Sequence, residues 1–230
     1  MKKTVCTIIT NNKDETFCKL LKNNNIHYVE IVPTDLEDSV FLNSLKNNNI
    51  KISSIQGLLY GLTGSISDQT TWSSCFNRIQ DIHKKSSEHN VKYFVFGSPS
   101  WRKVPVKEDL LIKFLLELYA LEVDLGIKIC FENCCSQYGS NILNTYNQVE
   151  TICSQLNLSY MLDRSSFIAE KENKIQTEPM HFHVSEFNFL GCPESLEHIF
   201  KFNTTEYCGL ECKLSKNIVQ DIELFGKLIV

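Results

Sequence analysis

Short apolar runs alternate with amphipathic segments along the whole chain. Eight of the runs are rich in Val, Ile, Phe and Tyr and are almost continuously apolar. That pattern is typical of parallel strands that are buried on both faces of a sheet. The eight expected strands are KTVCTII from Lys3, IHYVEIV from Ile26, KISSIQGLL from Lys51, VKYFVFG from Val91, IKICFEN from Ile127, LSYMLD from Leu158, HFHVSEF from His181 and YCGLECKL from Tyr207.

The segments between these runs carry apolar residues at helical spacing. The clearest, residues 108–125, repeats Leu and Phe on one face of the expected helix. Asn-rich stretches at 23–25 and 47–49 follow two expected helices, and Asn tolerates the left-handed backbone of a helix C-cap. We interpret these stretches as caps and turns and not as linkers between domains. The expected helices cover residues 14–23, 36–47, 70–89, 108–125, 142–156, 195–202 and 215–226.

Eight strand–helix units in 230 residues leave about 29 residues for each unit. This length predicts an α/β fold with one compact (β/α)8 TIM barrel that spans residues 1–230 as a single domain. A doubly wound open sheet is the alternative, and it would normally place a Gly-rich phosphate loop after the first strand. The stretch from Ile8 to Lys13 contains no glycine, so the barrel is favoured.

Composition narrows the class of protein. A hydrophobic content of 43% permits a sizeable core, and a net charge of −4 argues against a nucleic-acid partner. No run approaches the roughly 18 apolar residues of a membrane span, and the N-terminus lacks a complete signal peptide.

The ten cysteines include no CxxC pair, and the adjacent Cys134 and Cys135 point apart, so we expect reduced structural cysteines. The sequence therefore predicts a cytoplasmic protein without a membrane partner, and it leaves a homo-oligomer open.

Four of the expected strands end in a potential metal ligand. These are Glu132, Asp163, His183 and Glu211, at intervals of 31, 20 and 28 residues. In a barrel, the C-terminal ends of neighbouring strands meet at one mouth, so the four side chains should converge. Any one of them alone could be a solvated residue of the rim. Together they predict a site for a divalent metal ion such as Mn, Mg, Co or Zn.

Other polar residues near the same strand ends are candidates for substrate binding. Gln56 sits in a buried strand and needs hydrogen-bond partners, so it either contacts substrate or joins structural elements. Arg102 follows a tight loop and could bind a sugar hydroxyl, a carboxylate or a phosphate, or lie on the surface. His181 shares a strand face with the ligand two residues later. It is either a partner of the ligands or a packed interior histidine.

Two candidates lie just beyond the last strands. Glu186 could contact substrate or cap a turn, and Lys213 shares the face of the ligand two residues before it. The loops at 187–192 and 213–217 give a weak signal for a phosphate site, because TIM barrels often bind phosphate there.

Several motifs together are similar to a known superfamily. They are KISSIQGLLYG from Lys51, FGSPSWR from Phe96, FENCCSQYGSNILNT from Phe131, LD at Leu162, HFHVSE from His181 and LECK from Leu210. The chain resembles the xylose-isomerase-like TIM-barrel superfamily over essentially its whole length, and its sugar phosphate isomerase/epimerase branch most closely. In the ketose 3-epimerases of that superfamily, Glu, Asp, His and Glu at the ends of strands five to eight hold the metal. Those positions match Glu132, Asp163, His183 and Glu211, and the resemblance implies that the two Glu are also the acid/base pair.

The resemblance implies a metal-dependent isomerase or epimerase of a sugar or sugar derivative, phosphorylated or nucleotide-linked forms included. The reaction would remove a proton next to a carbonyl, pass through a metal-stabilised enediolate and return the proton to the other face. Three positions depart from the epimerase pattern: Ser166 replaces a histidine, Phe189 an arginine and Tyr138 a glutamate. These departures indicate a changed substrate pocket.

Three alternatives follow from the same comparison. The first is a metal-dependent sugar lyase or dehydratase on the same barrel. The second is a degenerate barrel that binds a sugar or a protein without catalysis. The third, a trinuclear-zinc DNA-repair endonuclease, requires further histidines that Ser166 and the Phe96-Gly97-Ser98 segment do not supply.

Overall fold

The computed structural model describes residues 1–10, 13–184, 204–211 and 218–227. Within them, eight parallel strands form a closed barrel in which each strand pairs with its neighbours in sequence and β8 pairs with β1. The expected TIM barrel is therefore confirmed. The strands are β1 Lys2–Cys6, β2 Tyr28–Ile31, β3 Lys51–Ile55, β4 Tyr93–Phe96, β5 Lys128–Glu132, β6 Tyr160–Asp163, β7 His181–Val184 and β8 Tyr207–Leu210.

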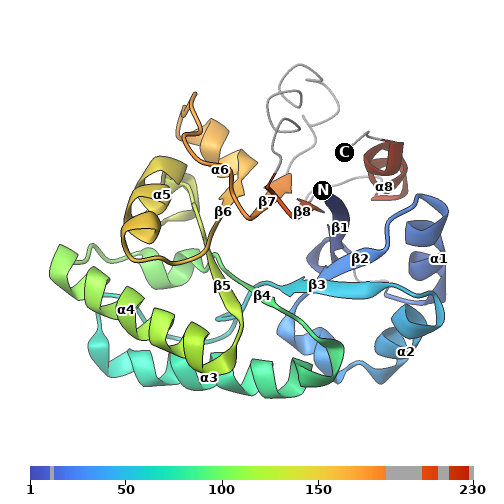
Figure 1. The fold of residues 1–230 in the computed structure, drawn as a ribbon, viewed down its shortest axis with the longest axis horizontal. Coiled ribbons are helices and arrows are strands. Elements are labelled where there is room, and N and C mark those ends of the chain that lie inside the picture. Colours follow the sequence, from blue (N-terminus) through green and yellow to red (C-terminus); the bar gives the residue numbers. More distant parts are fainter. Residues whose placement is uncertain (11–12, 185–203, 212–217, 228–230) are drawn as a thin grey trace.

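Helices surround the barrel, with α1 and α2 on one side and α4 and α5 on the other (Figure 1). The helices are α1 Glu15–Asn23, α2 Ser39–Asn47, α3 Trp72–Ser86, α4 Glu108–Leu125, α5 Tyr146–Gln155, α6 Arg164–Ala169 and α8 Ile218–Lys227. Short 3-10 helices cover Thr7–Ile9, Pro33–Glu37, Gln69–Thr71, Ser87–His89, Pro99–Arg102 and Ser136–Tyr138.

Local capping sets several of the helix boundaries. The side chain of Asp14 accepts hydrogen bonds from the backbone N–H groups of Thr16 and Phe17, which would otherwise lack partners at the start of α1. After α1 and α2, Asn25 and Asn49 both adopt φ 56°, the left-handed conformation that asparagine tolerates. The prediction of Asn caps and turns is thus confirmed.

Three helices differ in detail from the prediction. The helix expected at 142–156 starts only at Tyr146, because Thr145 caps α5. The helix expected at 36–47 starts only at Ser39, because Pro33–Glu37 forms a 3-10 helix and Asp38 then caps α2. Helix α6 was not predicted, because six residues are too few to show a 3.6-residue period. The helix expected at 195–202 lies outside the described residues.

The strands separate two kinds of core. On β5, Ile129 and Phe131 join the large apolar cluster with residues of the surrounding helices, whereas Cys130 between them joins a small cluster with Met161 and Tyr207. Alternate residues of a strand point to opposite faces, so the small cluster fills the inside of the barrel. Residues in register with Cys130, such as Glu132, therefore also point inward.

All eight described cysteines are free and buried. Within the described part of the chain, no helix has both the length and the apolar character needed to cross a membrane.

Candidate metal centre at the carboxyl ends of the strands

Three of the four expected ligands meet at the C-terminal mouth of the barrel. Glu132 is the last residue of β5, His183 lies in β7, and Glu211 directly follows β8. Nδ1 of His183 lies 2.9 Å from Oε1 of Glu132 and 3.3 Å from Oε2 of Glu211. One ligand atom from each of the three residues lies within 4.8 Å of the others. Two carboxylates thus surround one imidazole nitrogen.

Asp163 ends the strand between them and is coupled to the same group by charge. Burial raises the pKa of Asp163 to about 6, and the nearby Glu132 and Glu211 add to the increase. Its Oδ1 accepts hydrogen bonds from Ser165 Oγ at 2.6 Å and from Ser166 N at 3.0 Å, which also caps α6. The site therefore holds buried negative charge that the surrounding protein groups neutralise only in part. A bound cation would neutralise the remainder.

Glycine and asparagine residues hold the ends of the strands in place. Any Cβ at Gly97, which directly follows β4, would collide with the carboxylate of Glu132. The side chain of Asn133 accepts a hydrogen bond from Asp163 N at 2.7 Å and donates one to Asp163 O at 3.1 Å. These contacts fix the ends of β5 and β6 side by side, and with them the two carboxylates.

Glu30, on β2, is a site residue that the sequence pattern did not reveal. Its Oε1 lies 2.7 Å from Nε2 of His183 and accepts a hydrogen bond from Cys6 Sγ at 3.1 Å. Because Nε2 is directed at Glu30, Nδ1 of the same ring faces Glu132 and Glu211. A carboxylate behind a ligating histidine fixes its tautomer and orientation, and Glu30 has that position here.

Charge couples Glu30 and His183 strongly. Burial alone would lower the pKa of His183, but Glu30, then Cys6 and Glu132, raise it well above its ordinary value. Burial alone would raise the pKa of Glu30, but His183 and His181 hold it well below its ordinary value. Each member of the pair therefore favours the charged form of the other.

Cys6, Glu30 and His183 form a second group of potential ligands within 4.8 Å of one another. Their donors and acceptors already bind one another, and all three side chains are fully buried, so an ion would have no entry path. This group supports His183 and is not a second centre.

A polar column continues from Glu30 toward the other end of the barrel. Ser54 Oγ donates to Glu30 Oε2, Ser54 Oγ lies 3.1 Å from Ser53 Oγ, and Ser53 Oγ lies 2.8 Å from Thr4 Oγ1. We call Thr4, Ser53, Ser54, Glu30 and His183 the polar column. It satisfies polar groups that would be costly to bury alone.

The three described candidates for substrate binding have different environments. Gln56 is buried, and its Nε2 has no hydrogen-bond partner among the described residues. Arg102 is not on the surface: its Nη1 donates to Glu132 O at 2.7 Å and its Nη2 to Phe96 O at 2.5 Å, which ties β4 to β5. Glu186, Lys213 and both loops proposed for phosphate lie outside the described residues.

His181 faces the barrel interior, as its spacing from His183 predicts. Its Nε2 lies 3.2 Å from Glu30 Oε2 without hydrogen-bonding geometry, and its ring centroid lies 5.1 Å from that of His183. Gly209 makes room for both rings, because a Cβ there would come within 2.9 Å of His183 Cδ2. His181 is thus packed against Glu30, the partner of the candidate ligand His183.

Two of the positions that depart from the epimerase pattern can be described. Ser166 accepts a hydrogen bond from the backbone N–H of Cys135 at 3.1 Å and so joins the segment after β5 to α6. Tyr138 is 53% exposed. Phe189 lies outside the described residues.

The donor set fits a divalent cation. Carboxylate oxygens from three residues and one imidazole nitrogen are ligands that hard and borderline ions accept. The position also fits, because TIM-barrel enzymes carry their chemistry at this end of the strands.

Comparison with known proteins identifies the fold. No protein-family model and no curated protein matches the sequence. Among solved structures, an IolI protein with a bound zinc atom aligns over 99% of this chain and 95% of its own, with TM-score 0.73 and 16% identity. The 3-keto-D-glucoside 4-epimerase YcjR from E. coli aligns over 98% and 97%, with TM-score 0.72 and 16% identity. AsbF from Bacillus anthracis, a probable 3-DHS dehydratase involved in petrobactin synthesis, aligns over 99% and 98%, with TM-score 0.67 and 12% identity. The chain therefore has the fold of the xylose isomerase-like TIM barrels.

Proposed function

We propose that the protein is a divalent-metal-dependent isomerase or epimerase of a sugar or sugar derivative. The observation that carries the proposal is the convergence of Glu132, His183 and Glu211, with the charge-coupled Asp163 beside them. An ion held by these four residues would polarise a carbonyl oxygen of the substrate.

We assign the proton transfer to the two glutamates. The side chain of Glu132 is 13% exposed and that of Glu211 is 4% exposed, so both lie at the boundary between the mouth and the interior. In the proposed reaction one carboxylate removes the proton from the carbon next to the carbonyl, which leaves an enediolate. The other returns a proton to the opposite face. The free Nε2 of Gln56 would donate to a substrate oxygen.

Structural neighbours support the proposed class of reaction. YcjR is named as a sugar epimerase, and the IolI structure contains zinc. Each matches this chain over nearly its whole length, and the four candidate ligands lie at the strand ends where TIM barrels carry their active sites.

Elemental mass spectrometry of the purified full chain, loaded with Mn²⁺ and then dialysed, tests the metal site. We expect about one ion per chain in the wild type and its loss in Glu211→Gln. Glu206→Gln, at the opposite end of the barrel, should retain the ion and serves as the matched control. A wild type that holds no ion would contradict the proposal and would leave a binding role without catalysis.

A sugar dehydratase is the second candidate, and the similarity to the dehydratase AsbF favours it. An enediolate can lose a leaving group in place of regaining a proton. Incubation of candidate keto sugars with the metal-loaded protein in D₂O separates the two reactions. Deuterium at a substrate carbon without loss of water indicates epimerisation, whereas loss of water indicates the dehydratase.

A further inference from the structure

A cavity lies at the N-terminal mouth of the barrel, opposite the candidate metal centre. It has a volume of about 800 Å³, and the residues that start several strands line it: Lys2 of β1, Tyr28 of β2, Lys51 of β3, Tyr93 of β4 and Tyr207 of β8. All strands run in the same direction, so residues at their starts and residues at their ends lie at opposite mouths. The size lies within the range of small-molecule pockets.

The cavity is positively charged although the chain as a whole carries −4. Among the described residues that line it, four lysines, Lys2, Lys46, Lys51 and Lys92, face two glutamates. One of the glutamates, Glu206, is already engaged by Lys2 at 2.9 Å. Lys46, Lys51 and Lys92 form no ion pair with any described residue.

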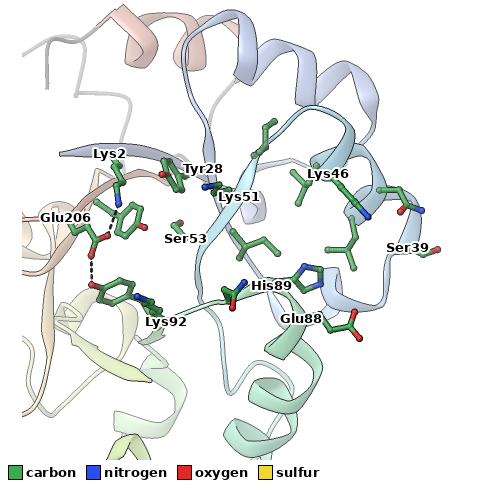
Figure 2. A pocket seen from close by; sticks show the side chains of 18 residues that line it. Lys2, Tyr28, Ser39, Lys46, Lys51, Ser53, Glu88, His89, Lys92 and Glu206 are labelled. Carbon is green, nitrogen blue, oxygen red and sulfur yellow. Dashed lines mark hydrogen bonds and ion pairs between the residues drawn. The ribbon is translucent and has the colours of Figure 1, made fainter. Parts of the chain in front are cut away.

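Three of the four lysines lie at one end of the cavity. Figure 2 shows Lys2, Lys51 and Lys92 around Ser53 at the barrel, with Lys46 at the far end on α2. A Lys ammonium is a compact point charge that binds phosphate oxygens well. Lys51 and Lys92 form no ion pair with any described residue, and two such charges at one mouth favour a group with more than one negative charge.

The walls of the cavity are partly apolar. The half-buried side chains of Leu42 and Ile52 line it beside the ring of Tyr28. A bare phosphate ion would leave this apolar surface in water. A molecule with an anionic head and an apolar body would cover it.

We propose that this cavity binds an organic phosphate. The phosphate group would lie among Lys2, Lys51 and Lys92, and the body of the molecule would lie along Leu42 and Ile52. The cavity shares no residue with the proposed metal ligands, although Ser53 in its wall belongs to the polar column that leads to His183. It also differs from the phosphate site common in TIM barrels, which lies at the other mouth.

Isothermal titration of the full chain with phenyl phosphate in 150 mM salt tests the proposal. Phenyl phosphate combines a phosphate group with an apolar ring and has no carbonyl for the proposed reaction. We expect one site per chain and at least tenfold weaker binding in Lys51→Gln/Lys92→Gln. The matched control is Lys107→Gln/Lys113→Gln, which removes two exposed lysines at a distance from the cavity, and it should bind like the wild type.

Three results would overturn the proposal. The first is absence of binding by the wild type at millimolar phenyl phosphate. The second is an equal loss of affinity in both double variants, which would indicate general attraction to surface lysines. The third is equal affinity for inorganic phosphate and phenyl phosphate, which would remove the role of the apolar wall. Circular dichroism of each variant verifies that the barrel is intact.

Discussion

The described charged residues at the two mouths of this barrel have opposite sign, and they are buried at one mouth and exposed at the other. At the C-terminal mouth, Glu132, Asp163 and Glu211 are largely buried around His183. At the N-terminal mouth, the lysines are exposed around a cluster of three tyrosines, Tyr28, Tyr93 and Tyr207. Burial raises the pKa of Asp163 to about 6, and the like charges of Glu132 and Glu211, which water screens poorly there, add to the increase. Exposed like charges are screened by water and salt, so they cost little. Among the described residues of the two mouths, those at the acidic mouth would therefore gain more stability from a bound counter-charge.

Asp163→Asn should have the largest effect on the acidic mouth, because it removes both a ligand and a buried charge. We expect metal affinity to fall by about 10³-fold or more, as several kcal/mol of ligation is lost. The metal-free variant should nevertheless gain about 1–3 kcal/mol of stability at pH 7.5. Asn can still accept the hydrogen bonds from Ser165 and Ser166 that cap α6.

The pH dependence of that gain has a definite sign. Between the ordinary pKa of 3.8 and the folded value of about 6, folded wild type keeps a proton on Asp163 that the unfolded chain releases. The wild type therefore loses stability as pH rises through this window, and the variant does not. Urea unfolding of both proteins without metal, at pH 4 and pH 7.5, measures the difference. A gain that is equal at both pH values would contradict the assigned cause.

Gly97→Ala should have the next largest effect, with the fold preserved. Its Cβ would occupy the space of the Glu132 carboxylate and displace that group from the mouth. A displacement of about 1 Å in a catalytic group can cost about 100-fold in rate. Ser100→Ala in the same loop is the control and should leave the rate of proton exchange into D₂O unchanged. Normal exchange by Gly97→Ala would exclude Glu132 as a proton-transfer group.

Glu30→Gln should weaken metal binding by about 10–100-fold, the usual cost of losing a partner behind a ligating histidine. The amide is nearly isosteric, but it holds the Nε2–H of His183 less strongly than the carboxylate does. Competition with a coloured chelator measures the affinity. Glu206→Gln removes a carboxylate from the opposite mouth and should bind the metal like the wild type. Equal affinities for all three proteins would show that Glu30 has no part in orienting His183.

Lys51→Gln should have the smallest effect on the metal centre, less than about twofold, because exposed charges at this distance are screened. The same change should clearly weaken the binding of phenyl phosphate. Parallel titrations with Mn²⁺ and phenyl phosphate compare the two mouths in one protein. A large change in metal affinity would mean that the mouths are coupled.

The fold was predictable from the sequence because strands buried on both faces leave long apolar runs, and all eight were found. The cluster of charged residues at the strand ends was also predictable, since a charged residue that ends such a run is conspicuous, as in Glu132 and Asp163. Glu30 was missed because it stands inside an apolar run, IHYVEIV, between residues that look like core. A charged residue within a buried strand requires a partner, and that requirement is the signal that could have identified it.

Other features depend on contacts that no local pattern encodes. Gly97 reads as a turn glycine, and only the structure reveals that it faces the carboxylate of Glu132. The cavity at the N-terminal mouth combines the first residues of strands that are far apart in sequence, Lys2 and Lys51 among them. Arg102 looked like a surface or substrate residue, because the backbone carbonyls that it binds belong to two different strands.

The polar column and the apolar layer outside the barrel should tolerate substitutions in different ways. The apolar layer between strands and helices specifies a barrel, and its residues can drift to others of similar volume. The column from Thr4 to His183 passes hydrogen bonds from one side chain to the next, so a change at one position requires compensation at its neighbour. Sequence drift among relatives should therefore be independent outside the barrel and concerted inside it.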